Sequence, residues 1–167
     1  MGLEKDIFCN NFEVWKKDKK ILFENQHVYS ILSITPTVPA LTLVIPKKHI
    51  ENFSELTGNI AEEFFHAIPK TFEIIQEIYE SCDKLRDLYE FYTQLSKTGP
   101  FDLAKLQAKE MLIHPELKVK PVAYNVGINY GTFAGQTVNH LHWQLIPRRE
   151  NKDRPFGIAT AFKEYLN

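Results

Sequence analysis

The chain has 167 residues, of which 44% are apolar and 25% charged, with a formal net charge of −1. This length and composition predict one globular domain, and the lack of a basic field argues against a nucleic-acid partner. No stretch approaches the ~18 consecutive apolar residues that span a bilayer, and we find no signal-peptide region and no disulfide spacing, so we expect a cytoplasmic protein without membrane contact.

The first third of the chain is rich in β-branched and apolar residues and predicts β-strands. We expect three short strands, at residues 21–24, 27–34 and 41–45. Pro36 and Pro39 mark the turn between the second and third strands, and Pro46 ends the third. The close spacing predicts an antiparallel hairpin or meander.

The middle of the chain has a helical period. After Asn52 apolar residues recur at spacings of three and four, which predicts a long helix that begins near Ser54 or Thr57. Pro69 lies inside this pattern and predicts a kink or a break. Two more helices are expected, at about residues 84–96 and 102–113.

The last third returns to a strand pattern, with a strand expected at 121–130 and another at 138–146, joined by a glycine-containing loop. Successive side chains of a strand point to opposite faces. The final strand should therefore have one apolar face for the core and one polar face. The apolar set is Leu141, Trp143 and Leu145, and the other set is Val138, His140, His142 and Gln144.

Two imidazoles on one face could bind a metal, transfer protons or attack an electrophile. A metal needs further ligands, and Gln144 is a poor one. Neutral imidazole is a good nucleophile near pH 7, and Asn129, Gln136 and Thr137 in the preceding loop can donate to phosphate oxygens. The alternative is a pair of core histidines whose ring nitrogens are satisfied by hydrogen bonds.

The same residues resemble the histidine triad (HIT) superfamily of nucleotide hydrolases and transferases. The family pattern is His-φ-His-φ-His-φ-φ after Gly-Gln-Ser/Thr-Val, with φ apolar, and residues 135–146 read GQTVNHLHWQLI. Similar blocks occur at 24–29, 43–50 and 125–131. The resemblance covers 7–66 and 121–158, and residues at about 80–118 look like a helical insertion in a single domain over 1–167.

The resemblance implies an α+β fold, with an antiparallel sheet of about five strands and one long helix. It also implies an enzyme that cleaves or transfers a nucleoside monophosphate, from a purine nucleotide, through a covalent nucleotidyl-histidine. His142 would be the nucleophile, and His140 would orient it through its backbone carbonyl and hold the phosphate site. The family's other site positions correspond to Asn129, Gln136 and Thr137 for phosphate, Ser33 for ribose, and Ile7 and Phe8 for the base. A homodimer without a cofactor is expected.

Three departures from the family pattern qualify this expectation. Gln144 replaces the third histidine, which resembles the transferase and dinucleoside-polyphosphate phosphorylase branch, and an amide cannot shuttle a proton. Leu41 stands where a histidine is frequent, and Ser33 where Asp or Asn is common. These changes leave open a second reading, a catalytically weak domain that binds nucleotide or a partner.

Some family members carry a zinc site that begins with a cysteine pair near the N-terminus. Here Cys9 is followed by Asn10, Asn11 and Phe12, so the cysteine pair is missing. We therefore expect no metal.

Overall fold

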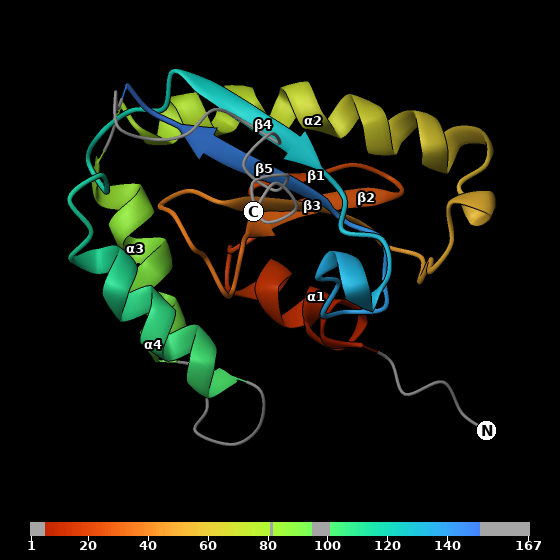
Figure 1. The fold of residues 1–167 in the computed structure, drawn as a ribbon, viewed down its shortest axis with the longest axis horizontal. Coiled ribbons are helices and arrows are strands. Elements are labelled where there is room, and N and C mark those ends of the chain that lie inside the picture. Colours follow the sequence, from red (N-terminus) through yellow and green to blue (C-terminus); the bar gives the residue numbers. More distant parts are fainter. Residues whose placement is uncertain (1–5, 81, 95–100, 151–167) are drawn as a thin grey trace, which may run out of the picture.

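The computed structural model describes residues 6–80, 82–94 and 101–150, and the statements below concern these residues. Its helices and strands follow the chain in the order shown in Figure 1. They are α1 (Ile7–Lys17), β1 (Phe23–Glu24), β2 (Val28–Leu32), β3 (Thr42–Pro46), α2 (Gly58–Ile78), α3 (Cys82–Thr93), α4 (Phe101–Leu112), β4 (Ala123–Gly127) and β5 (Trp143–Arg148), with short 3-10 turns at Phe53–Glu55 and Thr132–Ala134.

The strands form one five-stranded sheet in the order β1-β2-β3-β5-β4, and every neighbouring pair is antiparallel. This arrangement confirms the predicted α+β fold with an antiparallel sheet and one long helix. β3 lies beside β5 in the register Leu43↔Gln144, although about a hundred residues of sequence separate them. The sheet thereby brings the first third of the chain next to the histidine segment.

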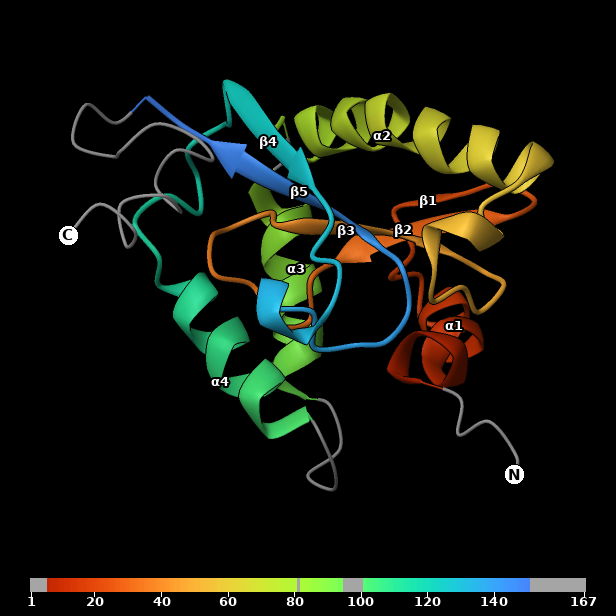
Figure 2. The ribbon, with the colours of Figure 1, turned by 45° about the vertical axis from the view of Figure 1, so that its right-hand side comes forward.

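Both faces of the sheet are covered (Figures 1 and 2). The long helix α2 lies along one face, where Val44 and Leu145 pack with Phe64 and Ala67. Helices α1, α3 and α4 lie on the opposite side in both views. Their core contains the alternate residues of the same strands, which explains why β2 and β3 are buried along their whole length.

Helix α1 was not among the elements expected from the sequence. Asp6 is its N-cap, and its side chain accepts hydrogen bonds from the backbone N–H groups of Phe8 and Cys9. Phe8 and Trp15 are almost fully buried against the sheet, with 2% and 1% of their surfaces exposed. Asp6 stands just before this segment, and Phe8 and Trp15 are about two helical turns apart. A capping side chain followed by apolar residues at this spacing predicts a helix, and the sequence analysis overlooked it.

The last strand is shorter than predicted. Residues 138–142 are not in a strand, and β5 begins at Trp143. The ladder with β3 stops because Pro46 has no N–H to donate and its carbonyl already accepts from His140. Leu141 instead donates its N–H to the carbonyl of Ile50, at 2.7 Å, so both histidines lie in the extended segment that leads into the strand.

Pro69, where a kink or a break was expected, does not break the helix, since α2 is continuous over 21 residues. Pro69 lies on the exposed side, whereas Phe64, Ala67 and Thr71 are buried. Packing of the buried face therefore outweighs the loss of one hydrogen bond on the solvent side. None of the described helices, α2 included, combines the length and apolarity needed to cross a membrane.

Candidate functional site

A pocket of about 620 Å³ opens beside His142, and residues of α1 and α4 form part of its lining. It is built from segments far apart in the chain: the start of α1, the loop after β2, the start of β3, the 135–144 segment and α4. Its lining residues are Asp6, Ile7, Phe8, Ser33, Ile34, Thr35, Thr37, Leu41, Leu43, Leu103, Gly135, Thr137, Val138, Asn139, His142 and Gln144. The pocket therefore has polar groups near His142 and an apolar remainder.

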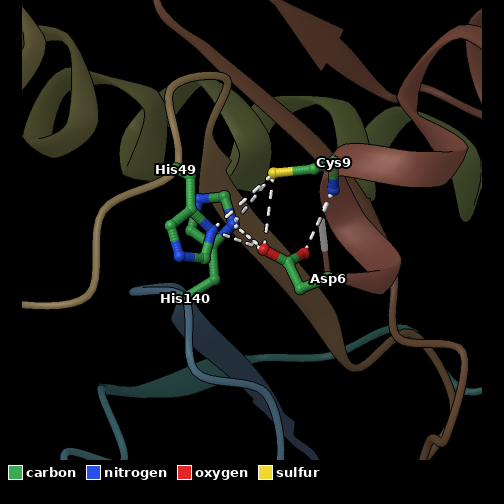
Figure 3. A group of neighbouring side chains, drawn as sticks. All are labelled: Asp6, Cys9, His49 and His140. Carbon is green, nitrogen blue, oxygen red and sulfur yellow. Dashed lines mark hydrogen bonds and ion pairs between the residues drawn. The ribbon is translucent and has the colours of Figure 1, made fainter. Parts of the chain in front are cut away.

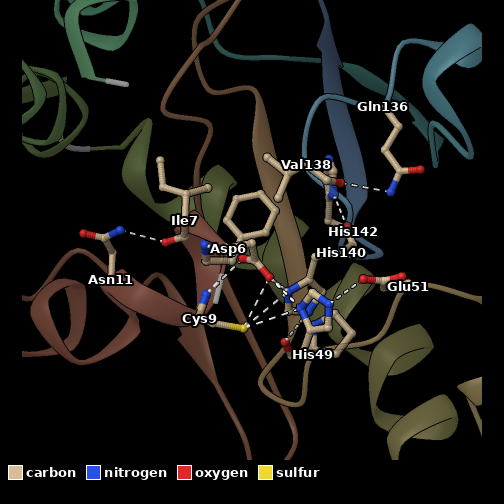
Figure 4. A network of polar contacts seen from close by, with 12 residues as sticks. Asp6, Ile7, Cys9, Asn11, His49, Glu51, Gln136, Val138, His140 and His142 are labelled. Carbon is tan, nitrogen blue, oxygen red and sulfur yellow. Dashed lines mark hydrogen bonds and ion pairs between the residues drawn. The ribbon is translucent and has the colours of Figure 1, made fainter. Parts of the chain in front are cut away.

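The ring of His142 is held by its own chain. Its Nδ1 atom lies 2.8 Å from the backbone oxygen of His140, a contact that the family resemblance implied (Figure 4). Because a carbonyl only accepts, Nδ1 carries the hydrogen, and the lone pair of the neutral ring is on Nε2. Burial lowers the pKa of His142, although its hydrogen bond to His140 partly opposes this. The ring is therefore neutral near pH 7, with Nε2 available as a nucleophile.

His140 is 1% exposed and lies behind the pocket rather than in its lining. Its Nδ1 is 2.9 Å from Oδ2 of Asp6, and its Nε2 is 3.0 Å from the carbonyl oxygen of Pro46. Both ring nitrogens thus face acceptors, which fixes the plane of the ring and the position of its backbone carbonyl. His140 is placed to orient His142. Its buried ring does not line the pocket, so the expected contact of His140 with the phosphate stays a prediction.

Asp6 is the centre of a cluster that joins α1 to the histidine segment (Figure 3). Its Oδ2 atom lies 2.6 Å from Nδ1 of His49 and 2.9 Å from Nδ1 of His140, and the thiol of Cys9 is 3.4 Å away. Burial opposes ionisation of Asp6, but the hydrogen bond and charge of His140 and the donors of Cys9 outweigh it and hold the pKa of this carboxyl below its usual range. Asp6 is therefore a carboxylate at neutral pH.

His49 is the partly exposed member of the cluster. Its Nε2 is 3.0 Å from Glu51, so the ring is placed between two carboxylates. The hydrogen bond that His49 donates to Glu51 raises the pKa of His49, burial partly opposes this, and the hydrogen bond to Asp6 adds to the increase. The raised pKa favours the protonated ring, whose positive charge balances that of Asp6.

The same four side chains fit a metal ion. One ligand atom from each of Asp6, Cys9, His49 and His140 lies within 4.8 Å of the others. Oxygen, sulfur and two imidazole nitrogens are a donor set that tetrahedral zinc accepts. Asp6, three positions before Cys9, takes the place of the second cysteine, which the sequence analysis expected after Cys9. A zinc ion here would supply structural cross-linking between α1 and the two histidines.

Comparison with known proteins identifies the family. A family model for the HIT domain matches residues 15–151. The chain belongs to the HIT family. It is 30% identical over 164 residues to Protein hit of Bacillus subtilis, which covers 98% of this chain and 83% of that protein. A crystal structure of a HIT family protein from Bacillus anthracis is similar with a TM-score of 0.55 and 25% identity, covering 98% of this chain and 90% of the other.

A more distant relative has a functional name. The asymmetrical bis(5′-nucleosyl)-tetraphosphatase of Schizosaccharomyces pombe is 20% identical over 148 residues, which are 89% of this chain and 58% of that protein. The name describes hydrolysis of a dinucleoside tetraphosphate by that relative.

The loop that precedes the HIT histidines is braced by two of the residues expected to bind phosphate. Gln136 accepts from the N–H of Gly131 at 2.7 Å and donates to the carbonyl of Val138 at 2.9 Å. Asn129 donates to the carbonyl of Gly135 at 3.2 Å. Neither side chain is part of the pocket lining, whereas Thr137 is. Their phosphate contacts stay predictions, and in this structure both amides hold the shape of the loop.

The remaining HIT positions are divided between the pocket and its support. Ile7 and Ser33 line the pocket, and the Ser33 hydroxyl accepts from the N–H of Thr35 at 3.3 Å. Phe8 is almost fully buried, with its ring centroid 5.2 Å from that of His142 in an edge contact. This position suits support of the histidine more than stacking on a base.

Leu41 and Gln144 occupy the pocket wall of this HIT domain. The side chain of Leu41 cannot form a hydrogen bond, and the described contacts show that His140 has Asp6 as a polar partner instead. Sequence reasoning missed Asp6 and His49, since contacts over 134 and 43 positions leave no local pattern. It also missed Leu103 of α4, which lies in the segment to which the sequence-based resemblance gave no role.

Proposed function

We propose that this protein transfers or cleaves a nucleoside monophosphate from a nucleoside phosphate, phosphoramidate or dinucleoside polyphosphate, with a covalent intermediate on His142. The observation that carries the proposal is the hydrogen bond between Nδ1 of His142 and the His140 carbonyl, in a ring that lines the pocket. It fixes the tautomer and leaves Nε2 as the nucleophilic atom. The named activity of the S. pombe relative supports the substrate class.

The reaction would run in two displacements at phosphorus. In the first, the lone pair of Nε2 attacks the α-phosphorus, an N–P bond forms and the bond from phosphorus to the leaving group breaks, with the electron pair leaving on that group. In the second, water or another acceptor attacks the same phosphorus, the N–P bond breaks with its electron pair returning to Nε2, and neutral His142 is restored. When the acceptor is water, its proton passes to the solvent. The His140 carbonyl accepts the Nδ1 hydrogen throughout and stabilises the positive charge on the ring.

Gln144 favours an acceptor other than water. Its amide lines the pocket where a third histidine could protonate the leaving group and deprotonate water. An amide can position a group by hydrogen bonding but does not exchange a proton near pH 7. An acceptor that already carries its negative charge, such as inorganic phosphate, avoids this need.

The test incubates the protein with a dinucleoside tetraphosphate, with and without inorganic phosphate, and separates AMP, ADP and ATP. Products that depend on phosphate support phosphorolysis, whereas equal AMP formation without phosphate supports hydrolysis. The His142→Ala variant is the control, and turnover equal to wild type in that variant would contradict the proposal.

A second candidate function is a nucleotide-binding or interaction module with weak catalysis. Leu41 and Gln144 favour this function. They line the pocket at positions where a histidine could transfer a proton, but one side chain is apolar and the other is an amide. In this case wild type and His142→Ala bind AMP alike, and neither forms product from the tetraphosphate.

We also propose a two-fold homodimer through the open edge of the sheet. β4 is an edge strand, and Val122 beside it is 65% exposed. Edge strands of this kind pair readily with a second copy and extend the sheet. Light scattering coupled to size exclusion measures the mass, and a Val122→Lys variant that stays dimeric counts against this edge as the interface.

A further inference from the structure

We infer that Leu103 of α4 contacts the nucleobase and determines specificity, an inference that rests on the proposed nucleotide site. Leu103 lines the pocket that contains His142, and 54% of its surface is exposed. An apolar side chain that is half exposed and part of a cavity wall has contact area left for a ligand. Helix α4 belongs to the segment for which the family pattern gave no role.

The helix is held firmly enough to place this side chain. One face of α4 presents Ala104, Ala108 and Met111 to the core, all at most 3% exposed. Leu103 is adjacent to this face and therefore lies at its border with the pocket. In Figure 2, α4 and α1 lie on the same side of the sheet. The pocket lining joins the two helices through Leu103 and Ile7.

Two buried tyrosines connect the neighbouring helix α3 to the opposite pocket wall. The hydroxyl of Tyr89 accepts from the N–H of Ala40 at 2.7 Å, and that of Tyr92 donates to the carbonyl of Leu32 at 3.0 Å. Ala40 and Leu32 are the chain neighbours of Leu41 and Ser33, which line the pocket. The helix pair and this wall thus form one unit.

Arg149 completes the connection on the other side of α4. Its guanidinium donates to the carbonyls of Pro39 at 3.0 Å and Val119 at 2.6 Å, and is 3.7 Å from the carboxylate of Glu116. The segment after α4 is thereby bonded to the loop before β3. These contacts add to the support of the helix that carries Leu103.

The chemistry of the pocket lining suits a nucleotide. The groups beside His142, such as Thr137 and Gln144, suit phosphate oxygens, whereas Ile7, Ile34 and Leu103 offer only apolar contact. The planar, largely apolar face of a nucleobase matches such a wall. Because Leu103 has no hydrogen-bonding group, it discriminates by contact area and favours purines over pyrimidines.

The experiment compares Leu103→Ala with Leu106→Ala. Leu106 is one turn along the same helix, is 56% exposed and is not part of the pocket lining, so it controls for changes in the helix itself. Binding of AMP and CMP is measured by calorimetry, and turnover of a dinucleoside tetraphosphate is measured alongside. A Leu103→Glu variant tests the same position by placing a charged, hydrated carboxylate against the apolar face of the base.

We expect Leu103→Ala to weaken AMP binding roughly three- to tenfold, to lower the AMP-to-CMP preference, and to raise KM with little change in kcat. Leu106→Ala should match wild type, and Leu103→Glu should bind AMP more weakly than Leu103→Ala. Equal AMP affinity in wild type and Leu103→Ala, or absence of AMP binding by wild type, would overturn the inference. Failure of the proposed function has a different signature, namely Leu103-dependent AMP binding without any His142-dependent turnover.

Discussion

Asp6 and His140 meet with Oδ2 and Nδ1 2.9 Å apart, although they are 134 positions apart in the sequence. Through this contact the first turn of α1 supports the ring of His140, and the backbone carbonyl of His140 in turn fixes His142. The same carboxylate contacts His49, so one partly buried charge interacts with both histidines. The stability of the fold and the geometry of the proposed nucleophile are therefore linked.

An Asp6→Asn substitution separates the charge of Asp6 from its capping role. Asn keeps an oxygen that can accept from Phe8 and Cys9, but it removes the negative charge beside His49 and His140. We expect Asp6→Asn to lower the free energy of unfolding by about 1–3 kcal/mol, as for loss of a hydrogen bond to a charged group. Asp6→Ala should cost roughly 1 kcal/mol more because the cap is also lost. Urea unfolding measures both, and equal stability of Asp6→Asn and wild type would contradict the role of the charge.

The pH dependence of turnover should reflect the lowered pKa of His142. Burial favours the neutral ring, so the unfolded chain takes up this proton at a higher pH than the folded protein. As pH falls below about 6.5, the unperturbed value, the ring stays neutral and active, while this group makes the fold progressively less stable. The acid limb of kcat/KM should have its midpoint below about 6.5. A dinucleoside tetraphosphate is the suitable substrate, since it has no terminal phosphate that titrates in this range, and a midpoint above that value would refute the assignment.

Zinc should stabilise the protein through the cluster around Asp6. The metal must displace protons from His49 and Cys9, and the raised pKa of His49 means that protons compete more strongly at lower pH. The increase in Tm on adding Zn²⁺ should therefore be larger at pH 8 than at pH 6. Cys9→Ser should reduce it, whereas His66→Ala, at a side chain that is 74% exposed, should not. An unchanged Tm at both pH values would leave the sequence-based expectation of no metal in place.

Tyr89→Phe should destabilise the pocket wall. It leaves the buried N–H of Ala40 without the hydroxyl that now accepts from it, at a residue whose φ of +64° is already unfavourable for a side chain. We expect a loss of about 1–3 kcal/mol of unfolding free energy and a lower Tm. Tyr130→Phe is the matched control, because the Tyr130 hydroxyl bonds to Asn52 at the surface. If both variants lose the same free energy of unfolding, the buried hydrogen bond contributes no more than the surface one, and the prediction is wrong.

The sequence predicted the faces of the histidine segment better than its secondary structure. Alternation correctly placed Leu141 and Leu145 in the core and His142 and Gln144 at the pocket. It did not show that the strand begins only at Trp143, because that depends on Pro46 of another strand. The local pattern predicts which face of the strand each side chain occupies. The residue at which strand pairing ends depends on the partner strand.

The other residues of the candidate site could not be predicted from local sequence patterns. Asp6 and His49 gain their roles only when the sheet brings α1 and the segment after β3 to His140. Leu103 reaches the pocket through the packing of α3 and α4, which no motif describes. Helix α1 is the exception, since the capping Asp6 and the spacing of Phe8 and Trp15 were visible in the sequence.

The most direct test of the account is to trap the covalent species. Wild type, His142→Ala and His27→Ala are mixed with a dinucleoside tetraphosphate, denatured rapidly at alkaline pH where phosphoramidates survive, and digested for mass spectrometry. We predict a nucleoside monophosphate on the peptide that contains His142 in wild type and in His27→Ala, and no such adduct in His142→Ala. An adduct on another residue, or product formation that persists in His142→Ala, would contradict the assignment of His142 as the nucleophile.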